Sequence, residues 1–316
     1  MITTSGRGHC TRTADPGGWS AADIPDLSGR TFVVTGGNGG IGAATTTALI
    51  SHGAQVIIAC RDTGKADALA RTLGALARVR RLDLADLASV RAFVDDCGPV
   101  DTVIANAGIS TVPKRLTATG IESHFATNHL GHFALITGLL DRIADRVVVV
   151  SSMTYRFTGL LHLGGLDVDD PGFSARRYSP FGAYCQSKLA NLLFAHELRR
   201  RLAAASSPVR VIAVHPGICT TTVGMHTGTR SGDLAWDLIT RVVGQSPEMG
   251  ALPALFGATA LDLPGGAFVV PGGPLGVRGH PVVSRTAATA RNDELAQQLW
   301  RRSVELVDFA HAAEPA

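Results

Sequence analysis

The chain of 316 residues has little of several residue types and patterns, and each shortage excludes a class of protein. No stretch approaches 18 continuous apolar residues, and the first 25 residues have no hydrophobic signal-peptide core. We therefore expect a protein that is neither exported nor anchored in a membrane. The five cysteines are odd in number and scattered without metal-type spacing, which indicates reduced thiols in a cytoplasmic protein.

Charge is also scarce, because only 17% of the residues are charged and the formal net charge is +3. The densest basic run, Arg199 to Arg201, falls where a long helix is expected to end. Cations at that position complement the helix dipole, so nothing in the sequence requires a nucleic-acid partner.

The apolar residues, 45% of the chain, suffice for a large core and are grouped in short runs that are largely β-branched. Longer helical patterns separate most of these runs, which is typical of a parallel sheet covered on both faces. We predict a single-domain α/β Rossmann fold, a doubly wound parallel sheet with helices on both faces. Residues 27–308 form this domain, residues 1–26 a loosely ordered N-terminal extension, and residues 309–316 a frayed tail. The runs are FVVTG, VIIAC, TVIANAG, VVVVSS, VRVIAVHPG and AFVV.

A glycine-rich turn follows the first predicted strand, Thr31 to Thr35, and precedes a predicted helix from Ala43 to Ser51. Glycine backbone without side chains lets a ligand approach, and a helix N-terminus offers unpaired N–H groups, so the two together favour binding of a pyrophosphate. The alternative is a tight turn that only closes the helix onto the sheet. The candidate cofactor-binding residues here are Gly36, Asn38, Gly40, Ile41 and Gly42.

The second predicted strand, Gln55 to Cys60, is followed directly by Arg61 and Asp62. An acid at this place holds the ribose 2′-hydroxyl of NAD, whereas an arginine accommodates the 2′-phosphate of NADP. We predict NADP(H), with Arg61 as the phosphate ligand. The alternatives are that Asp62 turns inward or that Arg61 is a solvated charge.

Tyrosine and lysine are rare, with three of each, yet Tyr184 and Lys188 stand four positions apart in the helical run AYCQSKLANLLF. That spacing places both side chains on one helix face. An ammonium beside a phenol favours the phenolate and lowers the tyrosine pKa, which suits a general acid or base. The alternative is that Tyr184 packs in the core and Lys188 is a solvated helix charge.

The predicted strand from Arg146 to Val150 finishes in Ser151 and Ser152, at the carboxyl edge of the sheet where open α/β folds bind ligands. A hydroxyl there can donate a hydrogen bond to a carbonyl oxygen whose charge grows during reaction. Strand-end serines are common, and Ser152 as an acyl-transfer nucleophile lacks the G-x-S-x-G elbow.

Two further groups of side chains are weaker candidates for a site. His124, Asn128 and His132 share helical spacing, but no spaced acid or cysteine completes a metal site, so we predict no metal. Asp167 and its neighbours at 169 and 170 lie in a predicted loop, where carboxylates are usually solvated.

These motifs, in this order, resemble the short-chain dehydrogenase/reductase family over about residues 27–308. Thr35, Gly36, Gly40 and Gly42 fill its TGxxxGxG pattern. The segments ACRD, LDLADLASVRAF, NHLGHF, AYCQSKLANLLF and ELAQQLWRRSVELV are similar to its retinol dehydrogenase and WW-domain oxidoreductase branch. The chain also resembles soluble actinomycete ketoreductases of secondary metabolism that act on polyketide or anthracycline ketones, such as the daunorubicin type.

The resemblance implies a role for each matching residue. Tyr184 protonates a carbonyl oxygen, Ser152 orients it, Lys188 also contacts the nicotinamide ribose, and Asn128 holds a water that connects the lysine to solvent. The family's discriminating acid aligns with Cys60, so its position is vacant, which agrees with NADP(H). The remaining cofactor contacts implied are Asp83 and Leu84 at the adenine, Asn106, Ala107 and Gly108 beneath the cofactor, Pro216, Gly217 and Ile218 around the nicotinamide, and Thr221 on its carboxamide or a phosphate.

The expected activity is therefore NADPH-dependent hydride transfer to a ketone or aldehyde of a small hydrophobic substrate. The alternatives are an NAD-dependent alcohol dehydrogenase that oxidises a hydrophobic secondary alcohol or retinoid, and a protein that binds NADPH without turnover. Residues 153–183 form an insertion and residues 222–250 a predicted substrate lid. The family favours homodimers or homotetramers.

Overall fold

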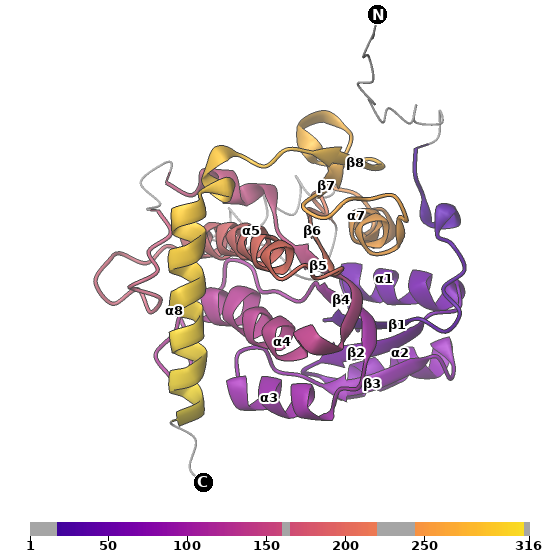
Figure 1. Ribbon diagram of the computed structural model, residues 1–316, viewed down its shortest axis with the longest axis horizontal. Coiled ribbons are helices and arrows are strands. Elements are labelled where there is room, and N and C mark those ends of the chain that lie inside the picture. The colour runs from indigo at the N-terminus through magenta and orange to yellow at the C-terminus, as the bar shows by residue number, and fades with distance from the viewer. Residues whose placement is uncertain (1–17, 160–164, 220–243, 313–316) are drawn as a thin grey trace, which may run out of the picture.

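The computed structural model describes residues 18–159, 165–219 and 244–312, and these residues build one eight-stranded sheet (Figure 1). The strand order is β3-β2-β1-β4-β5-β6-β7-β8. Neighbouring strands from β3 to β7 are parallel, which confirms the predicted α/β fold. The strands are β1 Thr31–Thr35, β2 Gln55–Cys60, β3 Ala77–Arg81, β4 Val100–Ala105, β5 Ile143–Val150, β6 Arg210–Val214, β7 Phe268–Pro271 and β8 Pro281–Ser284.

The last strand departs from the all-parallel sheet that the sequence predicted. β8 pairs antiparallel with β7, and three of its four residues are exposed. The strand is short, begins with proline and follows a glycine-rich stretch, so its sequence indicates a loop. An antiparallel edge strand on a parallel sheet is common in doubly wound folds.

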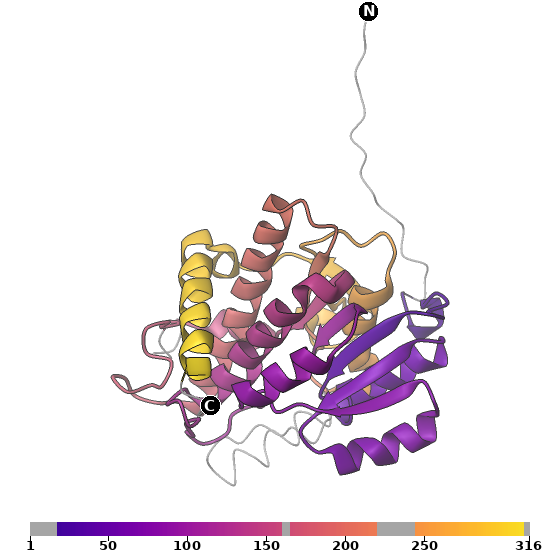
Figure 2. The same ribbon diagram turned by 60° about the horizontal axis from the view of Figure 1, so that its bottom comes forward.

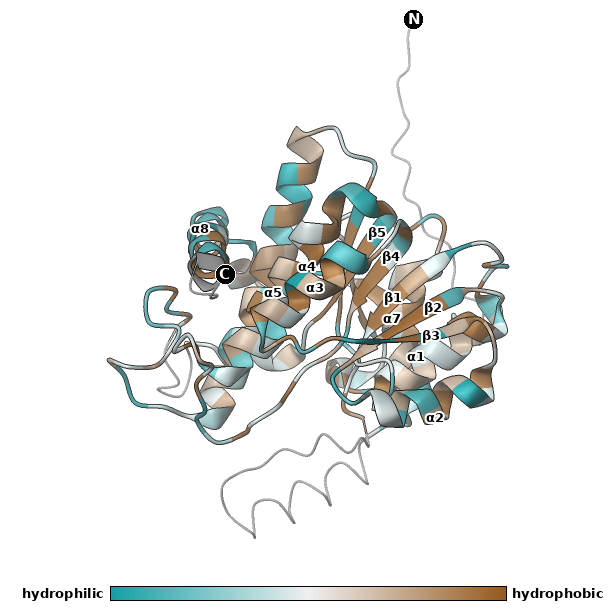
Figure 3. Ribbon diagram, turned by 90° about the horizontal axis from the view of Figure 1, so that it is seen from below, coloured by the Kyte–Doolittle hydropathy of each residue, from teal (hydrophilic) through white to brown (hydrophobic). Residues whose placement is uncertain are grey.

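Helices cover both faces of the sheet, and the strands between them are the most hydrophobic layer (Figures 1 and 3). One apolar cluster joins the sheet to α3, α4, α5 and α8, and a second joins its other face to α1, α2 and α7. The helices are α1 Gly40–Ser51, α2 Thr63–Leu73, α3 Leu87–Asp96, α4 Gly131–Leu139, α5 Pro180–Ala204, α7 Pro247–Thr259 and α8 Asp293–Ala312, with a π-helix at Phe125–Leu130 and 3-10 turns at Ala21–Asp23, Leu140–Arg142, Met153–Phe157, Pro274–Gly276 and Ala288–Arg291.

Several helices start where the sequence supplies an N-cap. Asp62 caps α2 by accepting a hydrogen bond from the backbone N–H of Lys65, and Ser179 caps α5 in the same way through Gly182. Proline follows Ser179 at the first helical position, where its missing N–H costs nothing. These caps fix the first turns of the two helices that carry Lys65 and Tyr184.

Both ends of the described chain are more ordered than expected. The ring of Trp19 meets that of Phe256 on α7 edge-on at 5.2 Å, and Ile24 is buried, so residues 18–26 pack on the domain rather than forming a loose extension. Helix α8 continues to Ala312, into the segment predicted to be a tail. It runs along the side of the molecule beside α5 (Figure 2).

Candidate active site

The predicted site residues gather at the carboxyl edge of the sheet. From β1 the chain adds β2 and β3 toward one edge of the sheet, and from β4 it adds β5, β6 and β7 toward the other edge. The β1–β4 pair is therefore the topological switch point. Open α/β folds bind ligands in the crevice beyond such a point. The turns after β1, β4, β5 and β6 carry, in order, the glycine turn, residues 106–108, the two serines and residues 215–218.

The glycine turn is held close to the residues that follow β4. The Thr35 hydroxyl accepts hydrogen bonds from the backbone N–H groups of Asn106 and Ala107, at 2.9 Å each, and the Asn106 amide donates back to the Thr35 carbonyl. A Cβ on Gly42 would lie 2.1 Å from the carbonyl oxygen of Gly36, so only glycine fits there. Helix α1 begins at Gly40, three residues earlier than predicted, and its N-terminal N–H groups therefore belong to the turn.

A cation that was not among the predicted site residues lies beside this turn. Arg61, the predicted phosphate ligand, is exposed after β2. The ammonium of Lys65, on the first turn of α2, lies 3.5 Å from the position that a Cβ of Gly39 would take. Asp62 uses its carboxylate to cap α2, and its carbonyl accepts a hydrogen bond from Asn38. The alternative in which Asp62 turns inward toward a ribose therefore does not describe this structure.

Tyr184 and Lys188 share a face of α5, as their spacing predicted. The Lys188 ammonium lies 5.8 Å from the centre of the Tyr184 ring and donates a hydrogen bond to the carbonyl of Val150 at 3.2 Å. Burial lowers the pKa of Lys188 to about 8. Lys188 is 5% exposed, which excludes the alternative of a solvated helix charge.

The expected direction of the Tyr184 pKa is wrong for this structure. Burial raises the pKa of Tyr184 to about 12, and a side-chain hydrogen bond with Ser152 opposes that rise without cancelling it. Desolvation disfavours the phenolate more than the neighbouring groups favour it. The phenol is therefore in its protonated form at neutral pH.

The serines after β5 have different tasks. Ser151 is buried and its hydroxyl donates to the carbonyl of Lys188 at 2.8 Å, which ties β5 to α5. Ser152 is partly exposed, accepts a hydrogen bond from the backbone N–H of Thr154, and bonds to Tyr184. The backbone N–H that follows Ser152, that of Met153, donates to the ring of His215 at 3.3 Å. The hydroxyls of Ser152 and Tyr184 thus share one corner of the crevice.

Asn128 lies in the π-helix, an element that is rare and frequent at functional sites. Its side chain accepts from the N–H of Ile109 at 2.8 Å and donates to the carbonyl of the same residue and to the hydroxyl of Ser187. A Cβ on Gly108 would lie 3.1 Å from Asn128 and 3.5 Å from the Lys188 ammonium. Asn128 therefore fixes the segment after β4 against the helix that carries Lys188.

Comparison with known proteins shows the family. A family model described as short chain dehydrogenase matches residues 30–160. Human retinol dehydrogenase 13 is 38% identical over 91% of this chain and 86% of its own length. The chain belongs to the short-chain dehydrogenase family. Human polyprenol dehydrogenase is 35% identical over 92% of this chain and 88% of its own. A crystal structure of an uncharacterised protein from Mycobacterium paratuberculosis is 44% identical with a TM-score of 0.78, over 92% of this chain and 98% of that one.

The other residues that the family resemblance assigned to the cofactor make structural contacts. Asp83 accepts a hydrogen bond from the N–H of Ala85, and the carbonyl of Leu84 lies so close to Gly131 that no Cβ fits between them. Pro216 accepts a hydrogen bond from Gln245, and Ile218 donates to the carbonyl of Val277. Thr221 and residues 222–243 of the predicted lid lie outside the described residues, and residues 247–250 belong to α7.

The two histidines considered as metal ligands are engaged elsewhere. His124 bonds to Glu122 and to the N–H of Val112, and His132 bonds to Thr35 and to the carbonyl of Asn128. Within residues 18–159, 165–219 and 244–308 no group of three His, Cys, Asp or Glu side chains could hold a metal ion. No helix in these ranges is long and apolar enough to cross a bilayer.

Two other features of the short-chain dehydrogenase lie apart from this site. Asp170, predicted to be solvated, is buried and accepts hydrogen bonds from Ser174 and Ala175.

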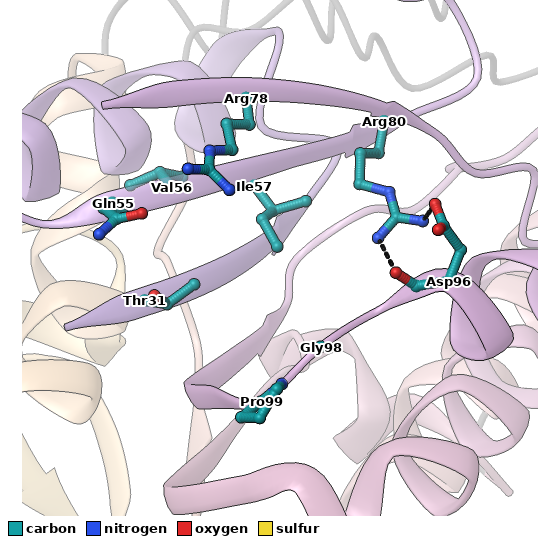
Figure 4. Close-up of a pocket in the computed structure, with 9 residues that line it drawn as sticks. All are labelled: Thr31, Gln55, Val56, Ile57, Arg78, Arg80, Asp96, Gly98 and Pro99. Carbon is teal, nitrogen blue, oxygen red and sulfur yellow. Dashed lines mark hydrogen bonds and ion pairs between the residues drawn. The ribbon is translucent and has the colours of Figure 1, made fainter. Parts of the chain in front are cut away.

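A cavity of about 210 Å³ lies at the opposite, amino edge of the sheet (Figure 4). Arg80 pairs with Asp96 there while Arg78 extends over β2. No residue of the crevice lines this cavity.

Proposed function

We propose that the chain is an NADPH-dependent carbonyl reductase that transfers hydride to a ketone or aldehyde of a hydrophobic substrate. The observation that carries this proposal is the meeting of Tyr184, Ser152 and Lys188 at the switch-point crevice. A proton donor, a second hydroxyl and a buried cation together are what carbonyl reduction requires.

The cradle beside β1 fits a dinucleotide. Its backbone is bare at Gly36, Gly39 and Gly42, and α1 directs its first N–H groups toward the turn. Lys65 lies beside Gly39 on the α2 side of this turn, and Arg61 directly follows β2, where an arginine would hold a 2′-phosphate. When bound, the nicotinamide supplies the hydride.

The side chains supply the proton and the electrostatics. As the carbonyl carbon gains hydride, the Tyr184 hydroxyl gives its proton to the oxygen, while the Ser152 hydroxyl donates a hydrogen bond to the same oxygen. The Lys188 ammonium stabilises the phenolate that this step leaves. Asn128 holds residues 108 and 109 beside the Lys188 ammonium. A proton that restores the Tyr184 hydroxyl after the reaction would enter from this place.

Burial keeps Tyr184 protonated at neutral pH, the form from which it can give a proton to a carbonyl oxygen. The alternative is oxidation of a hydrophobic alcohol with NAD, in keeping with relatives named retinol dehydrogenase and polyprenol dehydrogenase. That reaction requires a phenolate, which the burial of Tyr184 disfavours.

A substrate panel tests the reaction. NADPH consumption is measured with quinonoid, aliphatic and polyketide ketones and with a retinoid aldehyde, for the wild type and for Tyr184→Phe. We expect turnover of at least one apolar carbonyl, a fall in kcat of about 10³-fold in the variant, and an unchanged NADPH dissociation constant. Equal turnover by both proteins refutes the role of Tyr184. Tight NADPH binding without turnover on any carbonyl or alcohol would favour a non-catalytic binding protein.

A second experiment tests the cofactor. Arg61→Ala and Lys65→Ala should each weaken NADPH binding by roughly tenfold, as expected for the loss of a charge-assisted contact of about 1.4 kcal/mol. NADH binding should change little, because it has no 2′-phosphate. Arg78→Ala is the matched control, since that arginine lies at the other edge of the sheet. A wild-type preference for NADH would overturn the assignment.

A further inference from the structure

We propose that Glu122, His124 and Tyr178 form a clamp that positions the ring of Tyr184 for proton transfer. Glu122 and Tyr178 were not among the predicted site residues, and His124 was considered only as a metal ligand. The inference rests on the proposed role of Tyr184, and names positioning residues rather than groups that touch the substrate.

Glu122 is the centre of the clamp. Its carboxylate is completely buried and accepts hydrogen bonds from the backbone N–H groups of His124 and Phe125 at 2.9 and 3.1 Å. It also accepts one from the ring of His124 at 2.7 Å and one from the hydroxyl of Ser123 at 3.1 Å. Burial raises the pKa of Glu122, but the hydrogen bonds outweigh burial, so the net pKa is lowered and the carboxylate is ionised. A buried charge with this many donors has one well-defined position.

The hydrogen bonds of His124 determine its tautomer. Nδ1 faces the carboxylate of Glu122 and must donate, while Nε2 accepts from the N–H of Val112 at 3.2 Å. The ring is fully buried and cannot rotate without losing both bonds. Its edge meets the ring of Tyr184 with centres 6.3 Å apart and an interplanar angle of 64°. Tyr184 therefore contacts a fixed imidazole as well as lying near the ammonium of Lys188.

Tyr178 connects the clamp to the insertion that precedes α5. Its hydroxyl oxygen lies 3.1 Å from both the Glu122 carboxylate and the Val112 carbonyl, so these two acceptors share its single proton. The ring packs edge-on against Phe173 at 5.2 Å, and the Phe173 carbonyl accepts a hydrogen bond from Lys114. The segment after β4 and the insertion are thus tied to one carboxylate beside Tyr184.

The geometry of proton transfer explains why such a clamp would matter. A misplacement of about 1 Å at a reacting group costs on the order of 10²-fold in rate. Ser152 bonds to the Tyr184 hydroxyl and Lys188 lies near the ring, and a further contact with the ring would help to keep the hydroxyl on the substrate oxygen. The clamp provides this support without a hydrogen bond to the Tyr184 hydroxyl.

Removal of single hydroxyl groups tests the proposal. Tyr178→Phe keeps the ring and removes the bond to Glu122, and Tyr155→Phe is the matched control, because the Tyr155 hydroxyl accepts a hydrogen bond from Ala287 away from the clamp. With a carbonyl that the wild type reduces, we expect kcat to fall about tenfold in Tyr178→Phe, with KM and the NADPH dissociation constant within about twofold of wild type. Tyr155→Phe should keep the wild-type kcat. Equal kcat values for the two variants would overturn the clamp.

His124 offers a rescue test. His124→Gln retains a donor for Glu122 and an acceptor for Val112, whereas His124→Leu retains neither. We expect His124→Gln to recover at least a third of the kcat that His124→Leu loses, and no recovery would contradict positioning through hydrogen bonds.

A readout without turnover separates this inference from the proposed function. The chain has three tyrosines, so ring NMR signals from ¹³C-labelled tyrosine are few and can be assigned by substitution. We expect the Tyr184 signal to shift or broaden in Tyr178→Phe and to stay unchanged in Tyr155→Phe. An unchanged Tyr184 signal in both would refute the clamp, whatever the substrate panel shows. A shifted signal without turnover of any substrate would refute the function alone.

Discussion

The hydroxyl of Thr35 lies 2.9 Å from Nε2 of His132, and this contact joins the glycine turn to the helix that holds Asn128. The other ring nitrogen of His132 donates to the carbonyl of Asn128 at 3.0 Å. Burial lowers the pKa of His132 to about 4, so the ring is neutral and Nε2 must accept. The single proton of the Thr35 hydroxyl therefore goes to His132, while its oxygen accepts from residues 106 and 107.

Replacement of Thr35 by valine should disrupt this network. The change keeps the side-chain shape but leaves the Ala107 N–H and one imidazole nitrogen of His132 without a partner, whereas the Asn106 N–H keeps its bond to the Ile104 carbonyl. Unmet buried polar groups cost about 1–3 kcal/mol each, so we expect the free energy of unfolding to fall by about 2–6 kcal/mol. Denaturant titration measures it. Thr46→Val, which removes one hydrogen bond to the Gly37 carbonyl, should cost about 1 kcal/mol. Equal losses in the two variants would contradict the network.

Acid should destabilise the protein through three buried histidines. Burial lowers the pKa of His129 and His215 to about 3 and that of His132 to about 4, against 6.5 for the free side chain. Below pH 6.5 the unfolded chain binds protons that the folded chain does not. The free energy of unfolding should therefore fall as the pH drops from about 6.5 to about 4, by up to ~1.4 kcal/mol per pH unit for each histidine.

Denaturation curves at several pH values measure this slope. His129→Phe is the informative variant, because His129 already packs among Phe125, Phe133 and Phe194. Its stability should depend less steeply on pH than that of the wild type. Identical slopes would mean that His129 titrates normally in the folded protein.

The ionisation of Tyr184 can be observed directly. The chain has three tyrosines, so the Tyr184 ring signal of the ¹³C-tyrosine-labelled wild type can be assigned with Tyr184→Phe and followed with pH. Because burial raises its pKa to about 12, we expect almost no phenolate at pH 10, where a free tyrosine is about half ionised. Phenolate at pH 8 or 9 would show instead that the charge of Lys188 affects the Tyr184 pKa more than burial does, as the sequence alone predicted.

The rate of reduction should depend on the charge of Lys188. Burial lowers its pKa to about 8, so the ammonium is present below this pH and is lost as the pH rises through it. We expect kcat/KM for carbonyl reduction to be level below about pH 8 and to fall above it. Lys188→Arg, whose guanidinium stays charged, should be slower but should lack this decline. A decline that persists in Lys188→Arg would assign it to another group.

The sequence predicted most of the fold because the strands carry their own signal. The bounds of β1 and β2 agree to the residue with the apolar runs Thr31–Thr35 and Gln55–Cys60. β8 was not predicted, since four residues of an edge strand are stabilised by pairing with β7 rather than by a hydrophobic pattern. Trp19 and Ile24 were assigned to a loose extension because their partners are distant in the chain.

In the site, too, local spacing was predicted from the sequence, whereas burial and packing were not. The i, i+4 spacing of Tyr184 and Lys188 required a shared helix face, which the structure has. The sign of the Tyr184 pKa could not be predicted, because spacing reveals a neighbouring charge but not the burial that opposes it. Lys65 was missed for a similar reason. Its place three residues after the N-cap Asp62 indicates a first helical turn, but the direction of its side chain toward Gly39 depends on how α2 packs.

Because Asn128 lies in the π-helix Phe125–Leu130, its position depends on the number of residues in this turn as well as on their types. A π-helix holds an additional residue within its turn, and each residue of a regular helix advances the side chains by about 100°. Deletion of Thr127 would allow an ordinary α-helix to form while rotating Asn128 relative to the residues before it. We expect such a shortened protein to keep its circular dichroism spectrum and lose turnover, so that a more regular helix would make an inactive protein.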